Sequence, residues 1–176
     1  MSAGLPTPST APAGMASAAQ PVAHPGAPAL EFVFEIRANI GPALRAGPGR
    51  LGTRLHIPII GGTVRGQRLN GSVLPGGSDW ILARPDGASI IDAHYTVQAD
   101  DGTPIYVHNH GLRVSSVEVL ARLQRGEAVA PDEMYFRTAP VFDAPVGPHG
   151  WLSDHLFVAT LRRESDTIVV QVFMLH

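Results

Sequence analysis

The chain is 176 residues long and carries a formal net charge of −2, with 44% hydrophobic and 16% charged residues. This length suits one globular domain, and the near-neutral charge excludes the clustered basic surface that nucleic-acid-binding proteins present. The sequence contains no cysteine, which excludes disulfides, thiolate metal sites and a cysteine nucleophile.

The first segment, residues 1–29, consists mostly of Ala, Pro, Gly, Ser and Thr, and the first charged residue is Glu31. Such a composition offers little apolar surface to bury, so we predict a disordered tail followed by one domain over residues 30–176. The tail lacks the basic start and continuous apolar run of a signal peptide. No apolar run in the chain approaches the ~20 residues of a membrane-spanning helix. We therefore expect a cytoplasmic protein with no membrane or nucleic-acid partner.

Alternating residues predict strands from Leu30 onward. Phe32, Phe34 and Ile36 fall on one face of the first segment and charged residues on the other, which indicates a half-buried strand. Residues 40–52 are rich in Gly and Pro and predict a loop. Several short strands follow, and glycine-rich pairs and triplets mark the turns between them. These turn signals are Gly61-Gly62, Gly66-Gln67, Pro75-Gly76-Gly77 and Pro85-Asp86-Gly87.

Residues 88–98 and 103–113 predict a hairpin about the turn Ala99-Asp100-Asp101-Gly102. A capping box, formed by Ser115 and Glu118, then predicts the start of one short helix that ends near Gly126. Strands over residues 134–142, 155–163 and 167–175 complete the chain. Nine or ten short strands with one helix predict an all-β fold, closed as an antiparallel barrel or split into a sandwich.

Polar side chains within predicted strands are the candidate catalytic groups. Asp79, Asp92, Asn109 and Arg137 each lie in a segment that otherwise alternates as a strand, and Tyr135 is close to Arg137 in sequence. A carboxyl group among apolar walls has a raised pKa, which suits proton transfer, and an arginine stabilises developing negative charge. A structural Asp–Arg pair in the barrel wall is the alternative interpretation.

A set of aromatic side chains predicts the lining of a site for a ring-containing ligand. Core packing is the alternative interpretation for any one of them. The predicted substrate-binding residues are Trp80, Tyr95, His94, Phe136, Trp151 and Phe157.

Three histidines raise the question of a metal centre. Alternation places Asp92 and His94 on one face of their strand, and His108 and His110 on one face of the partner strand. Histidines two residues apart on a strand lie side by side, so the four groups could gather into a site. They could equally lie on a solvent-facing surface, and no third ligand is defined by spacing alone. We therefore expect no metal and no other cofactor.

Five ordered blocks carry a resemblance to a known family. They are GGTVRGQRLNGSVLPGGSDW (residues 61–80), RPDG (84–87), DAHYTVQADDGTPIYVHNHG (92–111), YFRTAPVF (135–142) and WLSDHLFVAT (151–160). From Leu30 to its end the chain resembles the domain-of-unknown-function family 3237, also called UPF0311. The resemblance implies a small antiparallel β-barrel, similar in outline to lipocalins and allene oxide cyclase. It implies no particular activity.

The same resemblance bears on individual residues. Asp79, Asp92, Asn109 and Arg137 fall on the family's motif positions. The family frequently carries arginine where this chain has His94, His108 and His110, and arginine does not ligate metals, so the resemblance argues against a metal centre.

Two functions from different classes fit these residues. One is a cofactor-independent isomerase, cyclase or lyase that acts on a small hydrophobic or ring-containing molecule in the barrel lumen. Asp92 or Asp79 would then move a proton, Tyr135 and Asn109 would hydrogen-bond the substrate, and Arg137 would stabilise negative charge. The other is a barrel that binds such a ligand without chemistry. A third interpretation is a barrel that mainly assembles into a homodimer or higher homo-oligomer.

Overall fold

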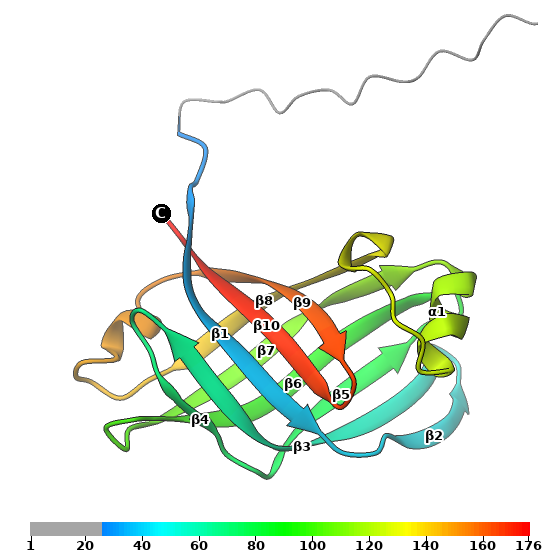
Figure 1. Ribbon diagram of the computed structural model, residues 1–176, viewed down its shortest axis with the longest axis horizontal. Helices are drawn as coiled ribbons and strands as arrows, with labels where there is room; N and C mark the ends of the chain where they lie inside the picture. Colours follow the sequence, from blue (N-terminus) through cyan, green and yellow to red (C-terminus); the bar gives the residue numbers. More distant parts are fainter. Residues whose placement is uncertain (1–25) are drawn as a thin grey trace, which may run out of the picture.

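The computed structural model describes residues 26–176, which form ten strands, one α-helix and two short 3-10 helices (Figure 1). The elements are β1 (Leu30–Ile40), β2 (Leu44–Gly49), β3 (Gly52–Gly66), β4 (Gly71–Val73), β5 (Gly77–Ala83), β6 (Ala88–Ala99), β7 (Pro104–Ser115), α1 (Val117–Gln124), η1 (Pro131–Glu133), β8 (Met134–Asp143), η2 (Gly150–Leu152), β9 (Phe157–Glu164) and β10 (Thr167–Leu175). The predicted disordered tail lies, over residues 1–25, outside the described residues.

The sheet closes on itself because β1 pairs with β10 on one side and with β3 on the other. From β10 the order runs through β9, β8, β7 and β6, and the short strands β4 and β5 share the place between β6 and β3. The result is a closed antiparallel barrel of eight strands, with two further strands at its margins. The predicted all-β barrel is confirmed, and closure leaves few unpaired strand edges.

Alternation along the strands decides what the barrel encloses. In β6 the residues from Ile91 to Val97 alternate between buried and half-buried, with Ile91, Ala93 and Tyr95 on the buried side. Because side chains of a strand alternate between its two faces, this side is the interior and the other faces outward. The core consists of such inward-facing side chains from all around the barrel.

A β-bulge changes one predicted face. The register of β1 against β10 shifts between Phe32 and Phe34, so Val33 and Phe34 are both buried while Phe32 is 46% exposed. The extra residue of a bulge reverses the alternation on one side of it. Phe32 therefore packs outside the barrel, edge-on against Phe173 at 5.7 Å between ring centroids.

Two stretches for which the sequence predicted a loop or a turn form strands instead. Residues 44–49 of the predicted Gly/Pro loop form β2, an exposed strand that pairs with the start of β3. The Gly61-Gly62 pair does not end a strand, because β3 runs continuously from Gly52 to Gly66. At Gly62 the φ angle is +147°, and a Cβ atom would lie 2.0 Å from the carbonyl oxygen of Arg37 in β1, so only glycine fits this crossing of the two strands.

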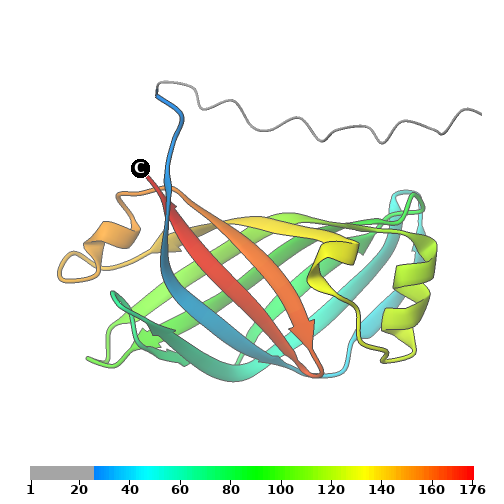
Figure 2. The same cartoon turned by 45° about the horizontal axis from the view of Figure 1, so that its top comes forward.

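The predicted helix is present as α1, one residue later than the capping box indicated. Ser116, not Ser115, is the N-cap, and its hydroxyl oxygen accepts a hydrogen bond from the backbone N–H of Val119. Gly126, with φ of +76°, follows the C-terminal end. The helix lies at one end of the barrel and η2 at the other in both views (Figures 1 and 2). No helix among the described residues is long and apolar enough to cross a membrane.

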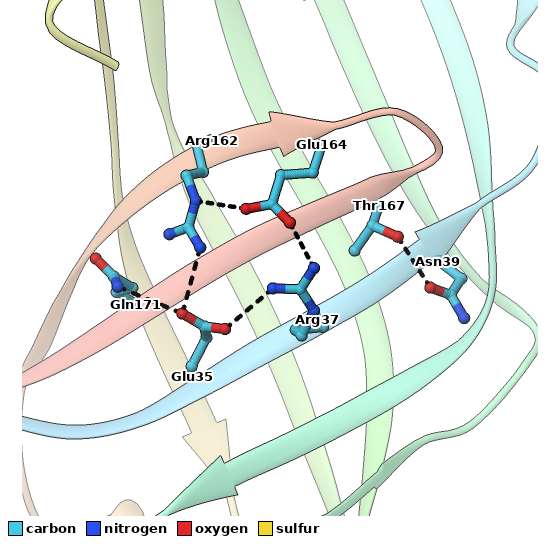
Figure 3. Close-up of polar contacts among 7 residues, drawn as sticks. All are labelled: Glu35, Arg37, Asn39, Arg162, Glu164, Thr167 and Gln171. Carbon is cyan, nitrogen blue, oxygen red and sulfur yellow. Dashed lines mark hydrogen bonds and ion pairs between the residues drawn. The ribbon is translucent and has the colours of Figure 1, made fainter. Parts of the chain in front are cut away.

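The outer face of β1, β9 and β10 carries a network of paired charges (Figure 3). Arg37 contacts both Glu35 and Glu164, and Arg162 contacts the same two carboxylates at 3.6 and 2.8 Å. Gln171 adds a hydrogen bond to Glu35. Each charge in this network has one partner of the opposite sign two residues away on its own strand and another across β10. The charges on this outer face are therefore paired with one another.

Candidate functional site

A mainly apolar cavity occupies the end of the barrel beside α1. The cavity has a volume of about 80 Å³ and opens to solvent at its mouth. Aliphatic side chains from β1, β3, β5, β6, β9 and β10 form most of its wall, with Leu123 of α1 and Phe136 of β8. Five polar residues also line it: Asp79, Tyr95, Asn109, Arg113 and Arg163. Apolar walls with a few convergent polar groups are typical of small-molecule sites.

Asp79 lies on β5, level with Ala93 of β6, which is in turn level with Asn109 of β7. The three residues therefore form one row across neighbouring strands, and the alternation of β6 makes this row face inward. One carboxylate oxygen of Asp79 accepts a hydrogen bond from the backbone N–H of Asp92 at 3.2 Å.

The environment of Asp79 changes its acidity. Burial raises the pKa of Asp79 to about 6, although the hydrogen bond from the Asp92 N–H and the positive charge of Arg113 act in the opposite direction. Desolvation penalises the charged carboxylate more than these two contacts favour it. The group is thus present in both protonation states near neutral pH, as a general acid or base requires.

Arg113 is, with Arg163, one of two polar cavity residues that the sequence interpretation did not include. Its Nη2 donates to the hydroxyl of Ser89 at 3.1 Å, and its guanidinium lies 6.0 Å from the ring centroid of Phe136. Burial lowers the pKa of Arg113, which the negative charge of Asp79 partly offsets. The sequence pattern could have indicated this residue, because Arg113 is four residues after Asn109 in β7 and therefore lies on the same face of the strand.

Three polar atoms on the cavity side chains are buried without a hydrogen-bond partner among the described residues: the Tyr95 hydroxyl, Oδ1 of Asn109 and Nε of Arg113. Tyr95 is 5% exposed and Asn109 2% exposed, so neither residue is freely hydrated. Burial also raises the pKa of Tyr95, with the negative charge of Asp79 adding to the effect, and the phenol stays neutral. Buried polar atoms are nearly always paired, so these atoms suggest a place for a polar ligand.

The structure divides the predicted catalytic and substrate-binding residues into three places. Asp79, Asn109, Tyr95 and Phe136 line the cavity. Five others alternate with the inward-facing residues of their strands, so they lie on the outer face, where they are half-buried or exposed. They are Asp92, His94, Tyr135, Arg137 and Trp80. Trp151 and Phe157 pack at the other end of the barrel, against each other. The predicted residues therefore do not form one site.

The outer residues include a compact group on β6 and β7. His94 and His108 are level across the two strands, and their rings stack with centroids 4.3 Å apart. Oδ1 of Asp92 lies 2.7 Å from Nε2 of His108 and 3.3 Å from Nε2 of His94. Burial alone would raise the pKa of Asp92, but the hydrogen bond to His108 and the charge of His94 lower it below the usual value.

Known structures share this fold. The crystal structure of the protein RPA1785 from Rhodopseudomonas palustris matches with a TM-score of 0.81 and 38% identity, over 87% of this chain and 100% of that chain. A structure from Acinetobacter baumannii, described as a beta-barrel like protein, matches with a TM-score of 0.76 and 30% identity, over 87% of this chain and 99% of that chain.

One relative has a described activity. The hydroalkoxylation enzyme phnH of Penicillium herquei is 32% identical over 84 residues, which are 48% of this chain and 56% of the fungal protein. The crystal structure of an enzyme from the same fungus matches with a TM-score of 0.65 at 23% identity, over 88% of this chain and 98% of that chain. At this identity the structural match shows a common fold and no more.

The resemblance found in the sequence is confirmed by the bacterial relatives. The R. palustris protein, a UPF0311 protein, is 42% identical over 147 residues, which cover 82% of this chain and 96% of that protein. The model of the family described as "Protein of unknown function (DUF3237)" matches residues 28–175. The chain therefore belongs to the DUF3237 family.

Proposed function

We propose that this protein is an acid/base enzyme, working without a cofactor, that adds a hydroxyl group across a carbon–carbon double bond within one small molecule held in the cavity. The observation that carries the proposal is Asp79, a carboxyl group with a pKa of about 6 in an apolar cavity. The activity of the partial relative phnH, hydroalkoxylation, supports this reaction class. Such an addition is an isomerisation that closes a ring, and its reverse opens one.

The reaction needs only proton movement. The Asp79 carboxylate takes the proton from the substrate hydroxyl, and the oxygen attacks one carbon of the double bond. The double bond is conjugated with a carbonyl group, and its electron pair moves through the second carbon into the carbonyl oxygen. Protonated Asp79 then returns the proton to carbon. One O–H and one C=C π bond are lost, one C–O and one C–H bond form, and no electrons enter or leave.

The other polar groups of the cavity suit the charge that develops. Arg113 places a guanidinium beside the carboxyl, and the neutral Tyr95 hydroxyl is a donor without a partner among the described residues. Donors already in place in an apolar site stabilise an oxyanion strongly, because little reorganisation is needed. Asn109 supplies a further amide for orienting the substrate.

The test uses a phenol whose ortho chain carries a double bond conjugated with a carbonyl group, such as ortho-hydroxychalcone, in deuterated buffer. We expect a cyclic ether with one deuterium on carbon. Asp79→Asn should lower kcat by roughly 10²–10⁴-fold, the usual contribution of a general acid or base. Asp143→Asn is the matched control, since Asp143 is exposed at the end of β8 and should leave turnover unchanged. Near wild-type turnover by Asp79→Asn would refute the assignment.

A barrel that binds a ligand without chemistry is the second candidate. The unpartnered polar atoms of Tyr95 and Asn109 favour it, because they call for a bound polar group whether or not a reaction follows. Mass spectrometry of small molecules released on denaturation distinguishes the two. A binding protein retains one compound, and Asp79→Asn retains it unchanged. An enzyme releases a product that Asp79→Asn no longer forms.

A further inference from the structure

The outer face of β6 and β7 carries an arrangement that the cavity does not use. Asp92, His94 and His108 each offer one ligand atom, and these atoms all lie within 4.8 Å of one another. The three side chains are 38–40% exposed, so an ion can reach them from solvent. Two imidazoles and one carboxylate form a donor set that suits zinc and similar divalent transition metals.

One of the separations equals that of two ligands on a tetrahedral zinc ion. With bonds of ~2.0–2.2 Å, two ligands of a tetrahedral zinc ion lie ~3.3–3.6 Å apart. The Asp92 Oδ1 to His94 Nε2 distance is 3.3 Å. The Asp92 to His108 distance is 2.7 Å, a direct hydrogen bond that opens slightly when an ion takes the place of the shared proton.

The backbone holds these side chains in place. His94 and His108 occupy directly opposite positions of the β6–β7 ladder, in the middle of the longest pairing of the barrel. Their rings are stacked with an interplanar angle of 10°. Strand positions fix where a side chain starts better than loop positions do, so an ion needs only a rotation of the two stacked rings that turns both Nε2 lone pairs toward it.

An outer partner orients one ligand. Nδ1 of His94 lies 2.6 Å from the hydroxyl of Tyr106, which is on the same face of β7. When Nδ1–H donates to this oxygen, the lone pair of His94 is on Nε2, the atom that points toward Asp92. Hydrogen bonds of this kind fix the tautomer of metal-binding histidines.

We infer that Asp92, His94 and His108 form a site for a divalent transition metal ion of the zinc type on the outside of the barrel, with Tyr106 as the residue that positions His94. Three protein ligands leave at least one coordination position open to water or to a ligand from solution. The site is separated from the cavity by the sheet and stands independently of the reaction proposed for Asp79.

The experiment titrates Zn²⁺ into the untagged full chain in competition with a chromophoric chelator. We expect one ion per chain. His94→Ala and His108→Ala should each lower the affinity by more than the ~10–100-fold that loss of an outer partner costs, and Tyr106→Phe should lower it by about 10-fold or more.

His56→Ala is the matched control, since His56 stacks on the partly exposed Trp80 on the same outer side of the barrel but lies outside the three-ligand group. Its affinity should equal that of the wild type. Thermal unfolding without metal shows that each variant is folded. The inference is overturned if the wild type binds no Zn²⁺, or if the chain with both His94→Ala and His108→Ala binds it as tightly as the wild type.

Discussion

Inward-facing side chains fill the two ends of the barrel lumen differently, with aromatic rings at one end and polar groups at the other. At the η2 end, Phe34, Phe142, Trp151 and Phe157 pack edge to face, with ring centroids 5.1–6.4 Å apart. The guanidinium of Arg68 lies 3.9 Å from the centroid of the Trp151 ring. Aromatic contacts of this kind are well-packed, stabilising interactions.

At the α1 end, the inward positions hold a carboxyl, a guanidinium, an amide and a phenol around an open cavity. These groups are buried with few partners, so they cost stability where the aromatic end contributes it. The aromatic end therefore stabilises the barrel, and the end beside α1 holds the buried polar groups.

The largest effect is expected at the aromatic end. Phe157→Ala removes a buried ring that contacts Phe142 and Trp151, and should lower the free energy of unfolding by about 3–5 kcal/mol. Phe32→Ala is the control, because that ring lies outside the barrel beyond the bulge and is 46% exposed. Chemical denaturation measures both. Equal losses for the two variants would contradict the assignment of the stabilising end.

The second prediction concerns Asp79 and pH. The pKa of Asp79 is about 6 in the folded protein against an ordinary value of 3.8, so the folded protein binds the proton more tightly than the unfolded chain. The resulting stability is fully present below pH ~4 and is lost as the pH rises through ~6, by about 3 kcal/mol in total. Asp79→Asn lacks this loss, so it should be more stable than the wild type above pH ~6.

Unfolding of both proteins by denaturant at a series of pH values measures this difference. Asp79→Asn keeps an oxygen for the Asp92 N–H, so the comparison isolates the charge. The same variant should lose catalytic activity, which separates stability from function at this residue. Parallel stability curves for the two proteins between pH 4 and 7 would show that Asp79 is not desolvated in solution.

A smaller effect is expected for Tyr95. Its hydroxyl is buried without a partner among the described residues. Because an unsatisfied buried hydroxyl costs about 1–3 kcal/mol, Tyr95→Phe should stabilise the empty protein by about 1 kcal/mol. It should also weaken binding of a phenolic ligand. A variant with a lower Tm than the wild type would instead indicate that an ordered water pairs with the hydroxyl.

The smallest effect is expected on the outer network of β1, β9 and β10. Arg37→Gln removes the contacts to Glu35 and Glu164, both solvent-accessible ion pairs. Exposed pairs contribute little and are screened by salt, so the variant should unfold only slightly earlier than the wild type in dilute buffer. The difference should vanish in concentrated sodium chloride, as measured by thermal unfolding. A difference that persists there would point to packing of the arginine stem.

Alternation in the sequence predicted the faces of β6 and β7 correctly. Ile91, Ala93 and Tyr95 are inside, while Asp92 and His94 are outside with His108. By the same alternation, Arg113 lies on the same face of β7 as Asn109, so the sequence could have predicted this cavity residue. The sequence did not show that Asp79 and not Asp92 lies in the cavity. Both acids lie among β-branched and aromatic neighbours, and composition does not distinguish the strand faces that they occupy.

Local patterns in the sequence predicted most of the strands and turns, the helix, and which side chains of one strand share a face, because these depend on neighbours within a few residues. Pairing between strands that are distant in sequence makes residues 44–49 a strand and carries β3 through Gly61-Gly62. It also sets which face is inward, where the bulge at Phe32 lies, and which residues of different strands are level. Asp79 meets Ala93 and Asn109 only through the register of β5, β6 and β7. Register is a property of paired strands, and a shift of one residue would exchange every inner side chain for an outer one.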